Sequence, residues 1–319
     1  MKIALTGASG FIGSAIVNTL KSSDVEILPL VRRRSSAPEG LKATEIDLED
    51  FASFDAETLK GCDSLIHTAA RAHIMKDESL DPLVEYRRIN RDATLELAKM
   101  AASAGVKRFI FLSSIKVNGE STKAESPFTA DSSYVPDDPY GLSKYEAEQG
   151  LLEIARNTDM EVVIIRPPLV YGPGVKGNFA SMISWIKKGI PLPLGAVHNQ
   201  RSLVALDNLV DFIILCARRN KSSKAANEVF LISDNKDIST SELLRKVARS
   251  YKVKSKLMPI PVSLMRFAAK ILGKDKIADR LFGNLQIDSS KAKNLLDWEP
   301  VIDMGGQLSK MAEYDQKVG

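Results

Sequence analysis

A tyrosine and a lysine four residues apart are the side chains of this sequence best suited to proton transfer. Tyr140 and Lys144 open a segment with helical periodicity, which places both on one face of a helix. A phenol with a pKa near ~10 is a poor base at neutral pH, and a nearby ammonium favours the phenolate. Ser113 and Ser114 stand at the end of a predicted strand, and a serine there can donate a hydrogen bond to a substrate oxygen. We therefore predict Tyr140, Lys144 and one of these two serines as a catalytic set.

The start of the chain has the composition of a loop that binds phosphate. The apolar run Lys2 to Thr6 leads into glycines at positions 7, 10 and 13 and then into a helical pattern. Gly7 permits a tight turn, Gly10 lets the backbone approach a pyrophosphate, and Gly13 lets the helix pack closely on the strand. The helix N-terminus presents free N–H groups to an anion. We predict a bound dinucleotide in contact with Gly7, Gly10, Phe11, Ile12 and Gly13.

A dinucleotide beside a tyrosine indicates hydride transfer. Such a cofactor exchanges hydride with a substrate carbon, and Tyr140 would give or take the hydroxyl proton in the same reaction. The sequence therefore predicts an enzyme.

Short apolar runs alternate with longer segments of helical periodicity through the first two thirds of the chain. This alternation predicts βαβ units and a parallel sheet. The predicted strands are 2–6, 25–31, 42–47, 64–68, 108–113 and 161–166, and the predicted helices are 11–21, 87–103 and 140–157. Beyond Pro167, Gly and Pro residues interrupt this pattern. We predict an α/β fold, with a doubly wound parallel sheet of the Rossmann type over residues 1–167. Residues 168–319 are predicted to form mainly a smaller α/β substrate lobe. The prediction allows some segments of this region to return to the Rossmann sheet.

Composition excludes several classes of protein. The 319 residues include 44 Lys or Arg against 40 Asp or Glu, a net charge of +4, which is too weak an excess to indicate a nucleic-acid partner. The two cysteines give neither a disulfide framework nor a metal cage, so a reducing, cytoplasmic location is expected and no metal site. The apolar stretches fall far short of the ~20 residues of a membrane span. No membrane partner is expected, and any membrane role would be indirect.

Several motifs together resemble the extended branch of the short-chain dehydrogenase/reductase superfamily. They are the GxxGxxG turn at residues 7–13, the SSxxVxG pattern at 113–119, the YxxxK pair, and RPPLVYGPG at 166–174. This resemblance covers nearly the whole chain. It implies that Lys144 also hydrogen-bonds the nicotinamide ribose and that Ser114 orients the substrate oxygen. It also implies a homodimer through the predicted helices 87–103 and 140–157. The further cofactor contacts that it implies are Asp47, Leu48, Ala69, Ala70, Asn90 and Pro167.

The end of the second predicted strand bears on the choice between NAD(H) and NADP(H). NAD-specific relatives carry an acid there for the ribose 2′-hydroxyl, whereas this chain has Val31 followed by Arg32, Arg33 and Arg34. Arginines suit a 2′-phosphate. We therefore favour NADP(H), with contacts from Arg32 and Arg33. NAD(H) is the alternative, with the arginines solvated.

The resemblance to nucleotide-sugar epimerases, dehydratases and reductases implies a UDP-sugar substrate. By that resemblance Asn178 would contact the nucleotide-sugar, and Arg201 would hold the diphosphate through its guanidinium group. Arg280 is a second candidate for the diphosphate, with a helix arginine in a salt bridge as its alternative interpretation.

Departures from the family patterns narrow the predicted reaction. Ile115 and Lys116 stand where dehydratases have an Asp-Glu pair, and this difference argues against 4,6-dehydration as the reaction. Leu169 stands where 4-epimerases usually have Asn, and Val31 where they have an acid. The leading prediction is an NAD(P)-dependent reductase of a UDP-4-keto sugar, similar to bacterial UDP-4-keto-6-deoxy-N-acetylhexosamine 4-reductases. The alternatives are a UDP-hexose or UDP-N-acetylhexosamine 4-epimerase and, from another class, a protein that senses the dinucleotide without catalysis.

Overall fold

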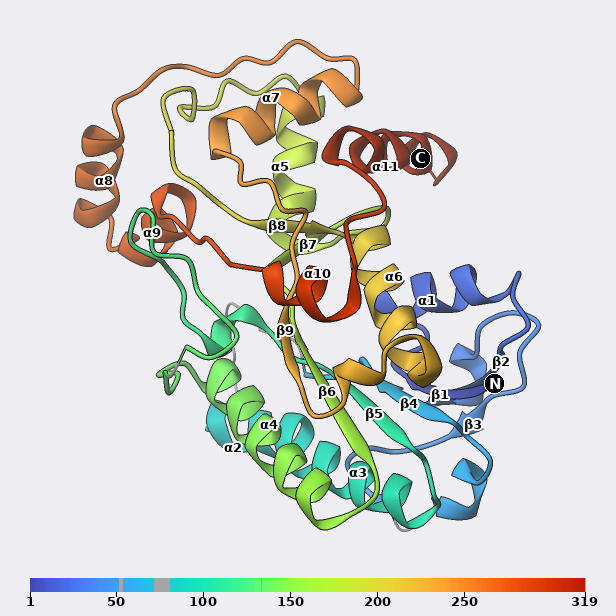
Figure 1. The fold of residues 1–319 in the computed structure, drawn as a ribbon. Helices are drawn as coiled ribbons and strands as arrows, with labels where there is room; N and C mark the ends of the chain where they lie inside the picture. Colours follow the sequence, from blue (N-terminus) through green and yellow to red (C-terminus); the bar gives the residue numbers. More distant parts are fainter. Residues whose placement is uncertain (52–53, 72–80, 133, 319) are drawn as a thin grey trace.

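The computed structural model describes residues 1–51, 54–71, 81–132 and 134–318. Its main feature is a seven-stranded sheet with the order β3-β2-β1-β4-β5-β6-β9, and every neighbouring pair is parallel. The strands are β1 (Lys2–Thr6), β2 (Glu26–Val31), β3 (Thr44–Glu45), β4 (Ser64–His67), β5 (Arg108–Leu112), β6 (Glu161–Arg166) and β9 (Val229–Leu231). The strand order reverses between β1 and β4, so the prediction of a doubly wound sheet is confirmed (Figure 1).

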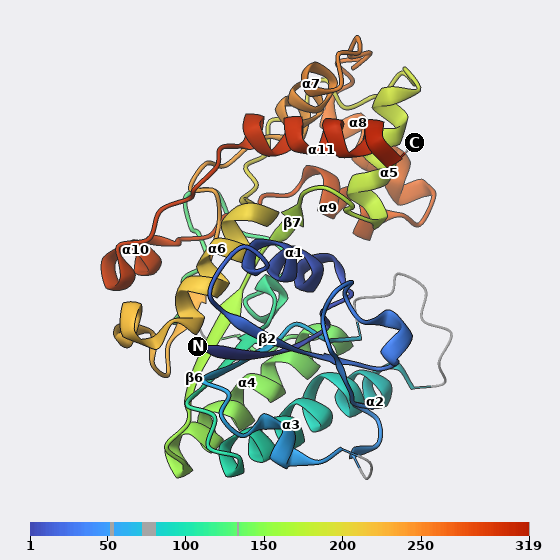
Figure 2. The same cartoon turned by 90° about the vertical axis from the view of Figure 1, so that its right-hand side faces the viewer.

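Alternate residues of each central strand face two different helical layers. Ile3 and Leu5 pack into a core with α1 and α6, whereas Ala4 packs into a second core with α3 and α4. Figure 2 shows α1 and α6 on one side of the sheet and α2, α3 and α4 on the other. Burial on both faces explains why the strands are nearly continuous apolar runs. The helices are α1 (Phe11–Leu20), α2 (Pro82–Tyr86), α3 (Ala93–Ser103), α4 (Pro139–Asn157) and α6 (Leu206–Ala217).

Two of the predicted elements differ in the structure. The predicted strand 42–47 contains only the two paired residues Thr44–Glu45, because only Leu30 and Val31 of β2 have partners there. The predicted helix 87–103 begins with a π-helical turn, Arg87–Asp92, before α3. That wider turn follows α2 and contains the buried side chain of Asn90. Single π-turns occur within helices most often at functional sites.

A second lobe lies above the carboxyl ends of the strands in Figure 1. It holds the two-stranded parallel sheet of β7 (Leu169–Tyr171) and β8 (Leu203–Ala205). Its helices are α5 (Gly177–Lys187), α7 (Thr240–Ser250), α8 (Val262–Ile271), α9 (Asp275–Phe282) and α11 (Met304–Val318). A separate apolar core fills it, with contributions from α5, α7 and α11.

The chain returns from this lobe to the main sheet twice. In the first return, α6 packs on the sheet and β9 extends the sheet by pairing with β6. In the second, α10 (Ser290–Leu296) packs against β9. Within the described part of the chain, no helix has the length and apolar character needed to cross a membrane.

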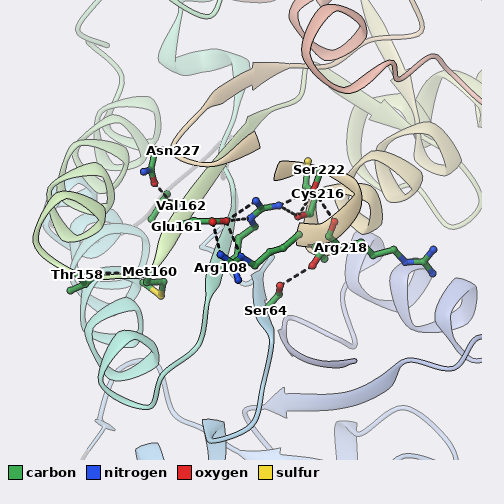
Figure 3. Close-up of polar contacts among 12 residues, drawn as sticks. Ser64, Arg108, Thr158, Met160, Glu161, Val162, Cys216, Arg218, Ser222 and Asn227 are labelled. Atoms are coloured by element: carbon green, nitrogen blue, oxygen red, sulfur yellow. Dashed lines mark hydrogen bonds and ion pairs between the residues drawn. The ribbon is translucent and has the colours of Figure 1, made fainter. Parts of the chain in front are cut away.

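A fully buried arginine fastens the returning segment to the amino ends of the strands, as Figure 3 shows. Arg108, at the start of β5, pairs with Glu161 at the start of β6, with 2.6 Å between Nη2 and Oε2. Its Nη1 donates to the carbonyl of Cys216 and to Ser222 Oγ, both at 2.7 Å. Burial alone would raise the pKa of Glu161, but hydrogen bonds from Arg219 and Arg108 lower it below its usual range. The cluster therefore joins two strands to the end of α6.

Replacement of Arg108 with methionine should lower the free energy of unfolding by about 3–5 kcal/mol, because it removes the fully buried member of a partly buried ion pair and leaves the Cys216 carbonyl and the Ser222 hydroxyl without this donor. Arg219→Met is the matched control. Arg219 also pairs with Glu161, at 2.7 Å, but its side chain is largely exposed, so its loss should cost about 0–1 kcal/mol. Urea unfolding at neutral pH measures both. Equal losses would show that the burial of Arg108 is not what gives the pair its strength.

Candidate active site

A cavity of about 990 Å³ opens at the carboxyl ends of β1, β4 and β5. Its volume lies in the range of ligand pockets, which is roughly 300–1,000 Å³. Its position is where ligands bind in doubly wound sheets, at the reversal of strand order. The predicted site residues that line it are Gly7, Gly10, Phe11, Ile12, Gly13, Arg32, Arg33, Leu48, Ala69, Ala70, Ser114, Tyr140, Lys144 and Pro167.

Two glycines at the turn between β1 and α1 leave no space for a side chain at their positions. Gly7 has φ +70°, and a Cβ there would lie 2.6 Å from Thr68 Oγ1. A Cβ on Gly13 would lie 2.1 Å from the carbonyl oxygen of Gly7. Gly10, at the helix N-cap, places no side chain over the first turn of α1. The first backbone N–H groups of α1 therefore face the cavity uncovered, which fits the pyrophosphate of a dinucleotide.

Tyr140 and Ser114 approach each other at the inner end of the cavity. Asp138 caps α4 by accepting a hydrogen bond from the Gly141 N–H at 3.2 Å, and this start of the helix positions Tyr140. Burial raises the pKa of Tyr140 to about 12. A hydrogen bond with Ser114 acts in the opposite direction but is outweighed by burial. The ring of Tyr86 packs edge-on against Tyr140, with 5.8 Å between centroids. In this structure Tyr140 is therefore a proton donor near neutral pH.

Lys144 lies one turn further along α4 and is almost completely buried. Its Nζ donates to the carbonyl of Leu112 at 3.0 Å and lies 4.4 Å from the ring centroid of Phe111. Burial lowers the pKa of Lys144 to about 7, although the negative charge of Glu148 raises it. The predicted stabilisation of a Tyr140 phenolate by a full ammonium is therefore weakened here, because burial disfavours both charged forms.

A buried ion pair that the sequence analysis missed lies directly behind these residues. Glu148 Oε2 and Arg166 Nη2 are 2.5 Å apart, and both side chains are almost fully buried. Glu148 also accepts a hydrogen bond from Ser113 Oγ, and Arg166 Nη1 donates to Asn118 Oδ1 at 3.0 Å. The signal in the sequence was an acid four residues after Lys144, on the same face of the helix.

The two neighbouring serines have different partners. Ser113 is engaged with Glu148, whereas Ser114 bonds Tyr140 and accepts from the Lys116 N–H at 3.3 Å. Both line the cavity. The hydroxyl available beside Tyr140 is therefore that of Ser114.

Two predicted cofactor residues do not belong to the described lining of the cavity. Asp47 is exposed, and its carboxylate accepts a hydrogen bond from the Glu49 N–H at 2.9 Å. Asn90 is buried, accepts from the Arg71 N–H at 2.9 Å and donates to Ser143 Oγ at 3.1 Å. Asn90 thus supports the cavity wall from behind, because Arg71 itself lines the cavity.

The three predicted substrate residues also lie outside this lining, in the second lobe. Arg201 Nη1 donates to the carbonyls of Arg280 and Gly283 at 3.0 and 3.1 Å. Arg280 pairs with Glu120 at 3.4 Å, and Asn178 is exposed on the first turn of α5. The structure therefore brings Arg201 and Arg280 together but leaves Asn178 on a separate element.

Other lining residues were missed because their types carry no signal of their own. They come from the last residue of β1, from the loops after β2, β3, β4 and β6, and from β7, and they include Thr6, Ser36, Glu49, Thr68, Arg71, Pro168 and Val170.

A family model described as the NAD dependent epimerase/dehydratase family matches residues 3–233. The chain belongs to this family. The resemblance to extended short-chain dehydrogenases/reductases is thereby confirmed, as is the prediction of an NAD-dependent enzyme; the interpretation as a non-catalytic sensor is set aside. The family model supports NAD and gives no support to the preference for NADP(H).

Two relatives in this family are 4-epimerases. The chain is 46% identical over 300 residues to a UDP-glucose 4-epimerase of Vibrio cholerae, which covers 93% of this chain and 90% of the relative. It is 30% identical over 272 residues to the N-acetyl-alpha-D-glucosaminyl-diphospho-ditrans,octacis-undecaprenol 4-epimerase of Escherichia coli O157:H7, with coverage of 82% and 77%. These matches favour the alternative prediction, a 4-epimerase, over the reductase.

Solved structures support the fold. A UDP-glucose 4-epimerase from Thermotoga maritima, solved with UDP-glucose, has a TM-score of 0.78 at 24% identity and covers 100% of this chain and 99% of its own. A UDP-glucuronic acid 4-epimerase from Bacillus cereus in complex with NAD has a TM-score of 0.76 at 20% identity, with the same coverage.

The burial of Lys144 predicts a specific dependence of stability on pH. Because its pKa is about 7 when folded and 10.5 when unfolded, the unfolded state binds more protons between these values, so stability rises with pH across this window. In protein stripped of dinucleotide, Lys144→Met should reduce that rise. Urea unfolding at pH 7, 8.5 and 10 measures it.

Lys99→Met is the control, because Lys99 is an exposed lysine on α3 and its replacement should leave the pH dependence unchanged. Parallel curves for the wild type and Lys144→Met would contradict the lowered pKa.

Proposed function

We propose that the protein is an NAD-dependent 4-epimerase of a UDP-sugar. The observation that carries this proposal is the 46% identity with the V. cholerae UDP-glucose 4-epimerase over 93% of the chain. The joint presence of Ser114, Tyr140 and Lys144 at one cavity supports it. Leu169 and Val31, which led to the reductase prediction, weigh less than a match of this extent.

The residues of the cavity fit NAD. The uncovered first turn of α1 would hold the pyrophosphate, and Leu48, Ala69 and Ala70 would flank the rest of the cofactor. Bound NAD supplies a hydride acceptor that takes hydride from a sugar carbon and later returns it. Arg32 and Arg33 are exposed at the cavity rim, which supports their alternative interpretation as solvated arginines.

Three side chains would handle the proton and the sugar oxygen. Tyr140, in its ionised form, would take the proton of the 4-hydroxyl group during oxidation and, as the neutral phenol, give it back after hydride returns to the opposite face of the sugar. Ser114, hydrogen-bonded to Tyr140, would orient the same oxygen. Any positive charge retained by Lys144 would favour the phenolate, and its contact with the Leu112 carbonyl fixes its position.

The substrate diphosphate would lie toward the second lobe. Arg201 and Arg280 are adjacent there, and Arg201 has the planar group suited to a diphosphate. Asn178 would be an additional contact from α5. We also propose the division at residues 167 and 168 into a dinucleotide domain and a mainly substrate-binding lobe, and a homodimer formed through α3 and α4.

The test of the proposed reaction is conversion without added cofactor. Purified protein should contain tightly bound NAD and should interconvert UDP-glucose and UDP-galactose, or their N-acetylated forms, with no dinucleotide supplied. Mass analysis of the released cofactor and chromatography of the sugars measure both properties. A protein that is empty and consumes NADPH in stoichiometric amounts would contradict the epimerase and restore the reductase. Conversion only of a sugar diphospho-polyprenol, as named for the E. coli relative, would contradict the UDP assignment.

Tyr140→Phe should lower kcat by about 100-fold or more, because it removes the group that transfers the proton. Bound dinucleotide should remain, since the cavity keeps its shape. Tyr145→Phe is the matched control: Tyr145 lies on the same helix outside the described lining of the cavity, and its loss should leave kcat unchanged. Full activity in Tyr140→Phe would exclude Tyr140 from the mechanism.

A further inference from the structure

Helix α8 (Val262–Ile271) has apolar residues on two faces but is covered on one. Val262 and Met265 pack against the core of the second lobe. None of its ten residues is buried. Large apolar side chains that gather on an exposed surface mark a site of interaction with a protein or a membrane, so the outer face of α8 requires explanation.

The outer face forms a continuous apolar stripe. Leu264, Phe267, Ile271 and Leu272 are between 57% and 70% exposed. Their spacing of three, seven and eight residues from the first places them on one side of a helix. Ile277 on α9 adds a fifth large exposed apolar side chain close in sequence.

The stripe lies in the most cationic part of the chain. Residues 251–282 contain eight Lys or Arg and two Asp, a net charge of +6. The remaining 287 residues contain 36 Lys or Arg and 38 Asp or Glu, a net charge of −2. The small net charge of the whole chain thus conceals a strongly basic segment. Its Lys and Arg residues flank the apolar stripe on both sides in the sequence.

Helices α8 and α9 form a defined structural unit at the edge of the second lobe (Figure 1). Arg266 on α8 pairs with Asp279 on α9 at 2.6 Å and lies 5.7 Å from the ring centroid of Phe282. Arg201 holds the end of α9 through two carbonyls. No residue of 251–282 belongs to the described lining of the large cavity. The stripe is therefore presented on a fixed support, away from the catalytic residues.

We propose that α8 docks on the surface of an anionic lipid bilayer and lies in its plane. Apolar side chains that enter the interface together with surrounding Lys and Arg are the features by which amphipathic helices bind anionic membranes. Ten residues are too few to cross the bilayer. A second copy of the chain fits poorly, because a two-fold contact through α8 would bring two segments of charge +6 together.

This inference goes beyond the proposed reaction and does not depend on it. It also departs from the expectation of no membrane partner, which considered only the length of apolar stretches. Periodicity within residues 262–272, together with local charge, was the signal available in the sequence.

Sedimentation with lipid vesicles tests the proposal on the full-length protein. We expect binding to vesicles of phosphatidylcholine with 30% phosphatidylglycerol, little binding to phosphatidylcholine alone, and a fall of about tenfold when salt is raised from roughly 0.1 to 0.5 M, since salt screens surface charge. Leu264→Gln with Phe267→Gln should weaken binding about tenfold through lost apolar insertion. Lys270→Glu with Lys274→Glu should do the same through charge.

Two control variants separate this surface from general effects. Val301→Gln changes an exposed apolar residue outside α8 and α9. Lys221→Glu with Lys224→Glu makes the same change of charge in the segment after α6. Both should bind vesicles like the wild type. Absence of wild-type binding, or equal weakening by the controls, would overturn the proposal. So would conversion of a dimer to a monomer by Leu264→Gln with Phe267→Gln in sedimentation without lipid, because the stripe would then be an interface between copies.

Discussion

The buried ion pair between Glu148 and Arg166 holds the catalytic helix against the sheet. It joins α4 to the end of β6, and through Ser113 it reaches the end of β5. Removing two charges from water costs several kcal/mol each, so such a pair persists only when the remaining hydrogen-bonding positions are filled. Here Arg166 also donates to Asn118, while Glu148 accepts bonds from both Ser113 and Arg166. Since Tyr140 and Lys144 precede Glu148 on the same helix, this pair fixes where their side chains enter the cavity.

The same burial sets the energetics of the site. Tyr140 and Lys144 have pKa values displaced toward their neutral forms, to about 12 and about 7. Their charged forms, which the proposed reaction would use, are therefore destabilised by the surroundings that position them. A site of this kind is expected to sacrifice stability for function. The positive end of α1 and the uncovered glycine turn would attract the anionic pyrophosphate of the proposed cofactor.

The second lobe is attached to the sheet by polar contacts where the chain passes between them. Asp234, just after β9, accepts from Tyr171 Oη of β7, from the N–H of Ala205 at the end of β8 and from Asn208 of α6, all at 2.7 or 2.8 Å. Burial raises the pKa of this carboxyl, although these three donors act to lower it. The return of α6 and β9 to the sheet makes the base of the second lobe continuous with the main sheet. Helix α8 stands apart from this arrangement, because it is held to the lobe only by its inner apolar face and by the contacts of Arg266 with α9, among the contacts described.

The sequence by itself determined the doubly wound sheet, the glycine turn and the placement of Tyr140 and Lys144 one helical turn apart at the same cavity, because these depend on local periodicity and on spacing within one turn. It also narrowed the substrate class through the family resemblance. Only the tertiary structure decided that Glu148 and Arg166 support the site, that Asn90 lies behind the cavity wall, and that Asp47 faces solvent. Those outcomes depend on which side chains meet across strands and helices far apart in the chain. Arg201 and Arg280 illustrate the same limit: their neighbouring positions arise from contacts between segments almost 80 residues apart, which no local pattern encodes.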